Sequence, residues 1–235
     1  MQRIAPVARP DLEGLPKEIA SWSDVLLGRT SNCMSVVATH SPLLARWFLG
    51  FIAAVRQPTL GATTDVRIRN LVGIKTSLVN QCEYCTSHSS LYGVALGLTE
   101  AELTALEGDA YKSSPLFSER EKTALSWAEA MTRNTAQRDV ALWSSMRELF
   151  TPTEIIEISL NICLFNMVNR LNDSLWMEIE PEEVNRRQGT ALKVSIEQLE
   201  EFASTFAKTG SAERARMSTV QNSNLPETKN RAARA

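Results

Sequence analysis

Apolar residues recur at intervals of three and four along most of the chain, which is the spacing that one face of an α-helix requires. No segment alternates apolar and polar residues as a half-buried strand does, and no tight turn joins two β-branched runs. The pattern therefore predicts an all-α protein. Its helices are expected over residues 11–27, from 41 onward, over 64–80 and 82–97, from 99 onward, from 118 onward, and over 139–150, 153–175 and 195–208.

Several of these helices have recognisable ends. Ser41 is expected to cap a helix that has Pro42 at its first position. Thr99 and Ser118 each precede an acidic first turn, which the positive end of a helix dipole favours. Gly97 is expected to end the helix before it, because glycine adopts the left-handed conformation of a helix cap without strain.

Length and composition indicate one domain followed by a tail. The 235 residues are 43% hydrophobic, which suffices to bury a substantial core. We expect a single helical domain over residues 1–208, with its core at about 40–180. Residues 209–235 contain few large apolar side chains and are rich in Ser, Asn and Arg, so this segment is predicted to be a disordered tail.

Charge and hydropathy exclude several partners. With 25 basic and 27 acidic side chains the charges nearly cancel, so neither nucleic acid nor an anionic membrane is an expected partner. No apolar stretch has the length of about 20 residues that a membrane span needs, and residues 1–10 lack the apolar core of a signal peptide. We therefore expect a cytoplasmic protein with reduced thiols, in which four cysteines indicate redox, metal or catalytic use.

The candidate chemistry lies in the sequence N-Q-C-E-Y-C-T-S-H at residues 80–88. Spacings of three place Cys82, Cys85 and His88 on one face of a helix, near its beginning. The positive end of a helix favours a thiolate, which is the nucleophile of sulfur chemistry. A second thiol one turn away can resolve an oxidised first thiol as a disulfide, and His88 can exchange a proton near neutral pH.

Zinc is the main chemical alternative for a C-x-x-C pair. A structural zinc site needs four ligands, and the chain has no second C-x-x-C. His40 is expected to cap or pack, and Cys33 and Cys163 are expected to be small apolar core residues. No metal site is therefore expected, and the absence of glycine-rich nucleotide motifs removes the usual grounds for a nucleotide cofactor.

Longer stretches around the cysteines resemble a known family. Residues 65–103 combine R-x-x-N-L-V, N-Q-C-E-Y-C-T-S-H and G-V-A-L-G-L-T-E-A-E-L, and in this they resemble the AhpD-like, carboxymuconolactone decarboxylase superfamily. The later runs F-S-E-R-E-K-T-A-L-S-W-A-E-A-M-T and L-F-T-P-T-E-I-I-E-I are similar to the second half of the longer, peroxidase-related members. The resemblance covers residues 40–180, approximately.

The resemblance implies an all-helical fold that assembles into homotrimers or homohexamers, with the cysteine pair at the foot of a buried pocket. It also implies that Cys85 attacks a peroxide, that Cys82 resolves the product, and that a glutamate and histidines relay protons. An external dithiol, either a redox partner protein or a low-molecular-weight compound, would restore the pair. No bound cofactor is expected.

The chain departs from the family pattern at the proton relay. Asn70 stands where the peroxidases carry a glutamate ahead of the first cysteine, and an amide cannot act as a general base. Tyr84 and Ser89 occupy positions that are often histidine in the family. His88 stands one residue before the usual second histidine, which turns its side chain by about 100° around the helix.

These departures each allow two interpretations. Asn70 could hold a water or a substrate carbonyl in place of the carboxylate, or it could mark a member whose relay has been lost. Tyr84 could donate a hydrogen bond into the pocket or pack at an oligomer interface. The candidate site therefore comprises Cys85, Cys82 and His88, with Asn70, Tyr84 and Ser89 as supporting or pocket residues.

Three functions are compatible with this sequence. The first is a thiol-dependent oxidoreductase that reduces hydroperoxides through Cys85 and Cys82, an antioxidant activity. The second is a lyase or decarboxylase that acts on a small carbon acid or lactone, as the other branch of the superfamily does, and its turnover would survive Cys85→Ser. The third is a non-catalytic member with an incomplete proton relay, which would bind a ligand without turnover.

Overall fold

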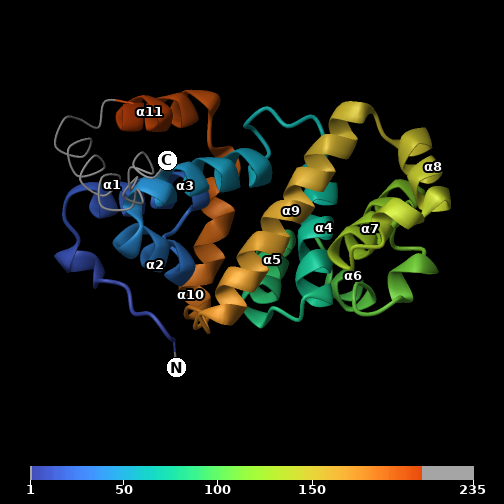
Figure 1. Cartoon of the computed structure of the whole chain (residues 1–235), viewed down its shortest axis with the longest axis horizontal. Coiled ribbons are helices and arrows are strands. Elements are labelled where there is room, and N and C mark those ends of the chain that lie inside the picture. The colour runs from blue at the N-terminus through green and yellow to red at the C-terminus, as the bar shows by residue number, and fades with distance from the viewer. Residues whose placement is uncertain (1, 208–235) are drawn as a thin grey trace, which may run out of the picture.

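The computed structural model describes residues 2–207, except for the side chains of residues 188–191, 206 and 207. The described chain is helical and contains no strand, which confirms the predicted all-α fold (Figure 1). The segment predicted as a tail, 209–235, lies outside the described residues. The α-helices are α1 (Gly14–Leu27), α2 (Asn32–His40), α3 (Pro42–Arg56), α4 (Val66–Val79), α5 (Glu83–Ala95), α6 (Glu100–Ala105), α7 (Glu119–Thr132), α8 (Val140–Leu149), α9 (Pro152–Ser174), α10 (Glu182–Asn185) and α11 (Ile196–Ala207), with short 3-10 segments at Arg9–Asp11, Ala110–Lys112, Ala136–Arg138 and Arg186–Lys193.

The long helix α9 crosses the molecule, with α1, α2 and α3 on one side and α4 to α8 on the other (Figure 1). Helix α4 is the centre of the second group, because it packs against α5, α7 and α9. Ten consecutive residues of α4, from Ile68 to Ser77, are buried. A helix surrounded in this way has no solvent face, so its polar side chains must find partners inside the protein.

Each side of α9 has its own apolar core. Leu26, Leu49 and Phe202 belong to a core that joins α1, α2, α3 and α11. Ile68 and Ile158 belong to a second core between α4, α7, α8 and α9. A smaller cluster of Cys33, Val36, Cys82, Tyr84, Cys85 and Met177 lies between the two sides, and it contains both cysteines of the C-x-x-C pair.

The predicted helix starts are largely confirmed. Thr99 and Ser118 form capping boxes at α6 and α7, and Thr151 forms another at α9. Pro42 occupies the first position of α3 as predicted, but the side chain of Ser41 makes no capping hydrogen bond. The backbone N–H of Ser41 instead donates to the carbonyl of residue 37 at 2.8 Å and so closes α2, a helix that the apolar pattern did not predict.

Four helices end in the same way, although glycine stands at only one of these ends. In each case the second residue after the helix is left-handed, and the N–H of the residue that follows it donates back to the carbonyl five residues earlier, as in a Schellman motif. At Gly97 this follows the prediction. The left-handed residues are Gln81 after α4, Gly97 after α5, Asn134 after α7 and Trp176 after α9, with φ of 57°, 93°, 57° and 52°.

Candidate functional site

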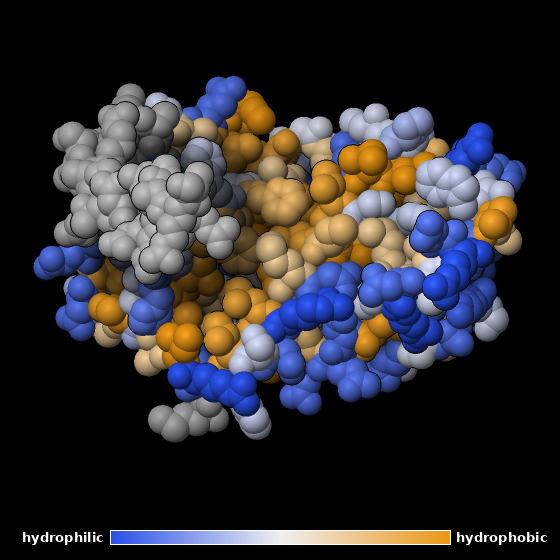
Figure 2. Space-filling model, in the orientation of Figure 1, coloured by the Kyte–Doolittle hydropathy of each residue, from blue (hydrophilic) through white to orange (hydrophobic). Residues whose placement is uncertain are grey.

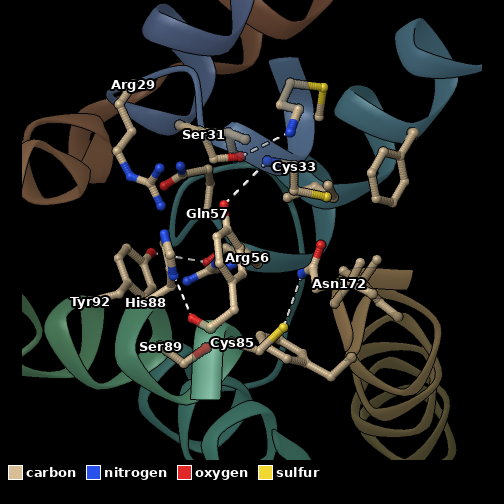
Figure 3. A pocket seen from close by; sticks show the side chains of 18 residues that line it. Arg29, Ser31, Cys33, Arg56, Gln57, Cys85, His88, Ser89, Tyr92 and Asn172 are labelled. Atoms are coloured by element: carbon tan, nitrogen blue, oxygen red, sulfur yellow. Dashed lines mark hydrogen bonds between the residues drawn. The ribbon is translucent and has the colours of Figure 1, made fainter. Parts of the chain in front are cut away.

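A pocket of about 90 Å³ lies between α2, α3, α5 and α9 (Figure 3). The part of its lining that comes from α3 and α9 is mostly apolar, with Phe48, Ile52 and Leu164 among its side chains. Helix α5 contributes polar and reactive side chains to the lining, among them Cys85 and His88. The polar lining residues are Arg29, Ser31, Cys33, Arg56, Gln57, Tyr84, Cys85, His88, Ser89, Tyr92 and Asn172.

The turn between α4 and α5 sets the position of the two cysteines. Because Gln81 is left-handed, the N–H of Cys82 reaches the carbonyl of Ser77 at 3.0 Å, and Cys82 becomes the residue that caps α5. Cys85 follows in the first turn of α5 and lines the pocket, whereas Cys82 lies beside it in the buried cluster. Both thiols therefore lie at the positive end of a helix, with one of them open to the pocket.

Cys85 is the thiol that ionises first. A hydrogen bond from the Cys82 thiol lowers the pKa of Cys85, burial opposes this, and the side-chain amides of Asn172 and Asn169 lower it further. The Asn172 Nδ2 donates to the Cys85 Sγ at 3.1 Å (Figure 3). The same sulfur–sulfur contact, together with burial, raises the pKa of Cys82. Of the two thiols, Cys85, which lines the pocket, is therefore the one that ionises more readily.

His88 is buried and held at both ring nitrogens. Its Nε2 lies 2.6 Å from Oε2 of Glu180, and its Nδ1 contacts the carbonyl oxygen of Tyr84. These two contacts hold the imidazole between Glu180 and the backbone of α5, with one face of the ring against Tyr84.

Glu180 is a residue of the candidate site that the sequence did not reveal. It lies in the extended segment between α9 and α10, is 7% exposed, and is 92 residues from His88 along the chain. Burial alone would raise the pKa of Glu180, but the hydrogen bond and charge of His88, the charge of Arg29 and the backbone N–H of Asn32 lower it to about 2. The hydroxyl of Tyr84 also donates to Oε1 at 2.7 Å. No motif marks this position, because its partners come from distant helices.

The supporting residues occupy different places. The Tyr84 ring packs on His88, with centroids 4.1 Å apart, and its hydroxyl points inward to Glu180. Ser89 lines the pocket, and its Oγ is buried without a hydrogen-bond partner in the described part of the chain. Asn70 does not line this pocket. It lies beside a smaller cavity of about 10 Å³, close against Gly93 of α5, where an added Cβ would be 2.7 Å from its Nδ2.

Cys33, Cys163 and His40 lie outside the C-x-x-C segment, and each has a different environment. Cys33 is buried as predicted but also lines the pocket, and burial with the nearby Glu180 charge raises its pKa to about 12. The prediction that Cys163 is a core residue is wrong, because Cys163 lies on an exposed position of α9. The Nε2 of His40 contacts the carbonyl oxygen of Ala5 at 2.8 Å.

Neither a membrane span nor a metal cluster is found in the described residues. Between residues 2 and 207, no helix combines the length and hydropathy needed to cross a bilayer. Over the same residues, His, Cys, Asp and Glu do not group in threes as metal ligands would.

Comparisons with known proteins agree with this fold. No family model matches the chain. The uncharacterized Escherichia coli (strain K12) protein YnjA is 27% identical over 132 residues, which are 56% of this chain and 69% of YnjA. The debrominase Bmp8 superposes with a TM-score of 0.64 at 20% identity, covering 81% of this chain and 97% of Bmp8. A cysteine-to-alanine variant of Bmp8 has been solved in complex with 2,3,4-tribromopyrrole.

A second solved structure describes the fold class directly. The peroxidase-related protein of Ralstonia eutropha JMP134, which has an alkylhydroperoxidase AhpD core, superposes with a TM-score of 0.65 at 18% identity. The match covers 79% of this chain and 96% of that protein. The chain therefore has the helical fold of AhpD-like, peroxidase-related proteins, and the resemblance found in the sequence is confirmed at the level of the fold.

Proposed function

We propose that this protein is a thiol-dependent oxidoreductase that reduces a small hydroperoxide through Cys85 and Cys82. The observation that carries the proposal is the position of Cys85, which lines the pocket beside Cys82, accepts a hydrogen bond from Asn172 and has a lowered pKa. A thiolate is the reactive form of cysteine toward peroxides. The similarity in fold to peroxidase-related proteins supports the same reaction class.

The proposed reaction has two steps, one at each cysteine. The Cys85 thiolate attacks the terminal peroxide oxygen, the O–O bond breaks, and an alkoxide leaves as Cys85 becomes a sulfenic acid. Cys82 then attacks the Cys85 sulfur, water leaves, and a disulfide joins the two residues. Once Cys85 has lost its negative charge, the largest cause that raises the pKa of Cys82 is gone while burial remains, so Cys82 ionises more readily for this second step.

The pair of His88 and Glu180 is proposed to supply the proton that the alkoxide needs. His88 lines the pocket, and Glu180 lies behind it as a carboxylate. In this chain Asn70 stands where the family carries its glutamate, so the carboxylate would come from another part of the fold. The loss of that glutamate therefore does not by itself imply a lost relay.

An external dithiol is proposed to return the disulfide to two thiols, because each turnover consumes two electrons. The resemblance suggests a redox partner protein or a low-molecular-weight dithiol for this step. No bound cofactor is needed for the proposed cycle.

The test is mass spectrometry of the fully reduced protein before and after one equivalent of an organic hydroperoxide. We expect a Cys82–Cys85 disulfide to form in the wild type and in Cys163→Ser, which lacks only the exposed thiol. Cys82→Ser should stop at the sulfenic acid, and Cys85→Ser should not react. Two thiols that stay reduced in the wild type would contradict the proposal and favour the lyase or the non-catalytic alternative.

The similarity to Bmp8 favours debromination as a second candidate. Replacing bromine by hydrogen on an aromatic ring requires two electrons and a proton, and the same dithiol pair and His88 could supply them. Incubation of the reduced protein with 2,3,4-tribromopyrrole tests this candidate. Release of bromide together with the Cys82–Cys85 disulfide would support it, and an unchanged probe would exclude that compound as a substrate.

A further inference from the structure

The lining of the pocket carries positive charge and no carboxylate. Its 18 residues, all described, include Arg29, Arg56 and His88 but no Asp or Glu. Glu180 lies behind this lining, 2.6 Å from His88 and 3.5 Å from Arg29. One carboxylate thus serves both Arg29 and His88, and within residues 2–207 no acidic side chain forms an ion pair with Arg56.

Arg56, the last residue of α3, is held by aromatic rings. Its guanidinium carbon lies 4.8 Å from the ring centroid of Tyr92 and 5.6 Å from that of Phe165. Its Nη2 is shut off from solvent and finds no hydrogen-bond acceptor among the described residues. A guanidinium in this position is costly to leave unpaired, so an acceptor brought by a ligand would relieve that cost. Figure 3 shows Arg56 in the same pocket as Cys85 and His88.

We infer that the pocket binds a small monocarboxylate, with its carboxylate on Arg56 and its hydrocarbon part against the apolar side chains of α3 and α9. The planar guanidinium matches a carboxylate in shape and charge. The volume of about 90 Å³ accommodates a short hydrocarbon chain. Within the proposed function, on which this last step rests, the substrate is a short hydroperoxide that carries a carboxylate and presents its peroxide to Cys85.

Arg56 could instead serve only as a counterion for the Cys85 thiolate. The groups that lower the pKa of Cys85 are the Cys82 thiol and the amides of Asn172 and Asn169, so that thiolate already has donors. The two roles differ in one consequence. Carboxylate binding that depends on Arg56 persists when Cys85 is replaced, whereas a pure counterion role predicts no carboxylate preference at all.

The experiment is calorimetric titration of the reduced full chain with butanoate and with butanamide, which has the same shape without the charge. We expect butanoate to bind at least about tenfold more tightly, the effect of one charge-assisted hydrogen bond. Cys85→Ser should keep this preference, and so should Arg147→Gln, which removes an exposed arginine of α8. Arg56→Gln should abolish it, with folding checked by thermal unfolding.

Arg56→Lys provides a second variant that retains the charge. It should keep a reduced preference for butanoate, because an ammonium cannot form the bidentate pair of hydrogen bonds that a guanidinium makes with a carboxylate. Equal binding of butanoate and butanamide by the wild type would overturn the inference, as would equal competition by inorganic phosphate or a preference that survives Arg56→Gln. Because no turnover is measured, these outcomes are independent of whether the disulfide forms with hydroperoxide.

Discussion

At the scale of single residues, the hydrogen bond from Asn172 to Cys85 is a direct control on thiol reactivity. The Nδ2 of Asn172 donates to the Cys85 sulfur, and its Oδ1 has no partner among the described residues. Asn172→Leu therefore removes one donor to the sulfur and leaves no other group unpaired. Because the donor lowers the pKa of Cys85, its loss raises that pKa and reduces the thiolate fraction near neutral pH.

We expect alkylation of Cys85 by iodoacetamide in Asn172→Leu to slow by about tenfold at pH 7, with the rise of rate against pH moved to higher pH. The measurement is made in a Cys163→Ser background, so that the exposed thiol does not react. An unchanged pH profile would mean that Asn172 does not stabilise the thiolate.

The lowered pKa of Glu180 predicts that the stability of the folded protein depends on pH. Its pKa falls from the ordinary 4.5 to about 2 in the folded protein. The carboxylate therefore contributes stability that is fully present above pH 4.5 and is lost as the pH falls toward 2, by about 3 kcal/mol in total. Glu180→Gln removes this contribution and leaves Arg29 and His88 without their carboxylate.

Urea unfolding at several pH values measures this effect. We expect Glu180→Gln to be less stable than the wild type by roughly 3–5 kcal/mol at pH 7. The difference should shrink steadily below pH 4.5, since the wild type loses the same charge there. A constant difference down to pH 2.5, approximately, would show that Glu180 acts by packing rather than by charge.

The sequence pointed to the residues of the candidate site that lie at the start of α5, and it missed those that other elements supply. Cys82, Cys85 and His88 follow from spacing within α5. Glu180 and Asn172 contact the same residues from 92 and 87 positions away, and no periodicity encodes such contacts. His88 stands one residue before the usual histidine of the family, and in this position it contacts Glu180.

At the scale of helices, the sequence predicted where helices begin better than where they end. Starts depend on one polar side chain and its backbone neighbours, which a sequence displays directly. Two of the four Schellman ends use Gln81 and Trp176, residue types that give no signal for a left-handed conformation, and a third uses Asn134. Helix α2 was missed because its nine residues follow a cap, Ser31, that carries no acidic turn.

Gln81 offers a test of the strain at one of these ends. A residue with a Cβ in the left-handed region costs about 1 kcal/mol more than glycine, and the φ of Gln81 is 57°. We expect Gln81→Gly to raise the free energy of unfolding by about 1 kcal/mol, measured by chemical denaturation. Asn134→Gly is the matched control with the same φ, and it should gain less because asparagine tolerates this conformation. Loss of stability in Gln81→Gly would contradict the assignment of strain.

At the scale of the whole molecule, the pocket is a product of assembly rather than of any one segment. Its charged and reactive groups come from the loop after α1, from α3 and from α5, and its apolar wall comes from α3 and α9. The resemblance predicted a pocket at the cysteines. It did not predict Arg56, because the chemistry of that arginine depends on the rings of Tyr92 and Phe165, which two other helices supply.

The surface of the molecule bears on the predicted homotrimer or homohexamer. Apolar side chains gather over the region of α3 and α9 (Figure 2). Leu44 and Trp47 on α3 are 68% and 65% exposed, and Ile156 on α9 is 60% exposed. Each large apolar side chain that becomes buried contributes about 1.5–3 kcal/mol, so contacts between copies through this face would stabilise an assembly.

Light scattering after size-exclusion chromatography tests the assembly. We expect the wild type to have three or six times the mass of one chain, and Trp47→Glu with Ile156→Glu to have the mass of a monomer, because a carboxylate at a buried interface is strongly disfavoured. Arg147→Glu, which changes charge at an exposed position of α8, should leave the mass unchanged. If the double variant keeps the mass of the wild type, copies meet elsewhere on the surface. A monomeric wild type would show that one chain forms the pocket without a partner, and that the assembly expected from the resemblance is wrong for this protein.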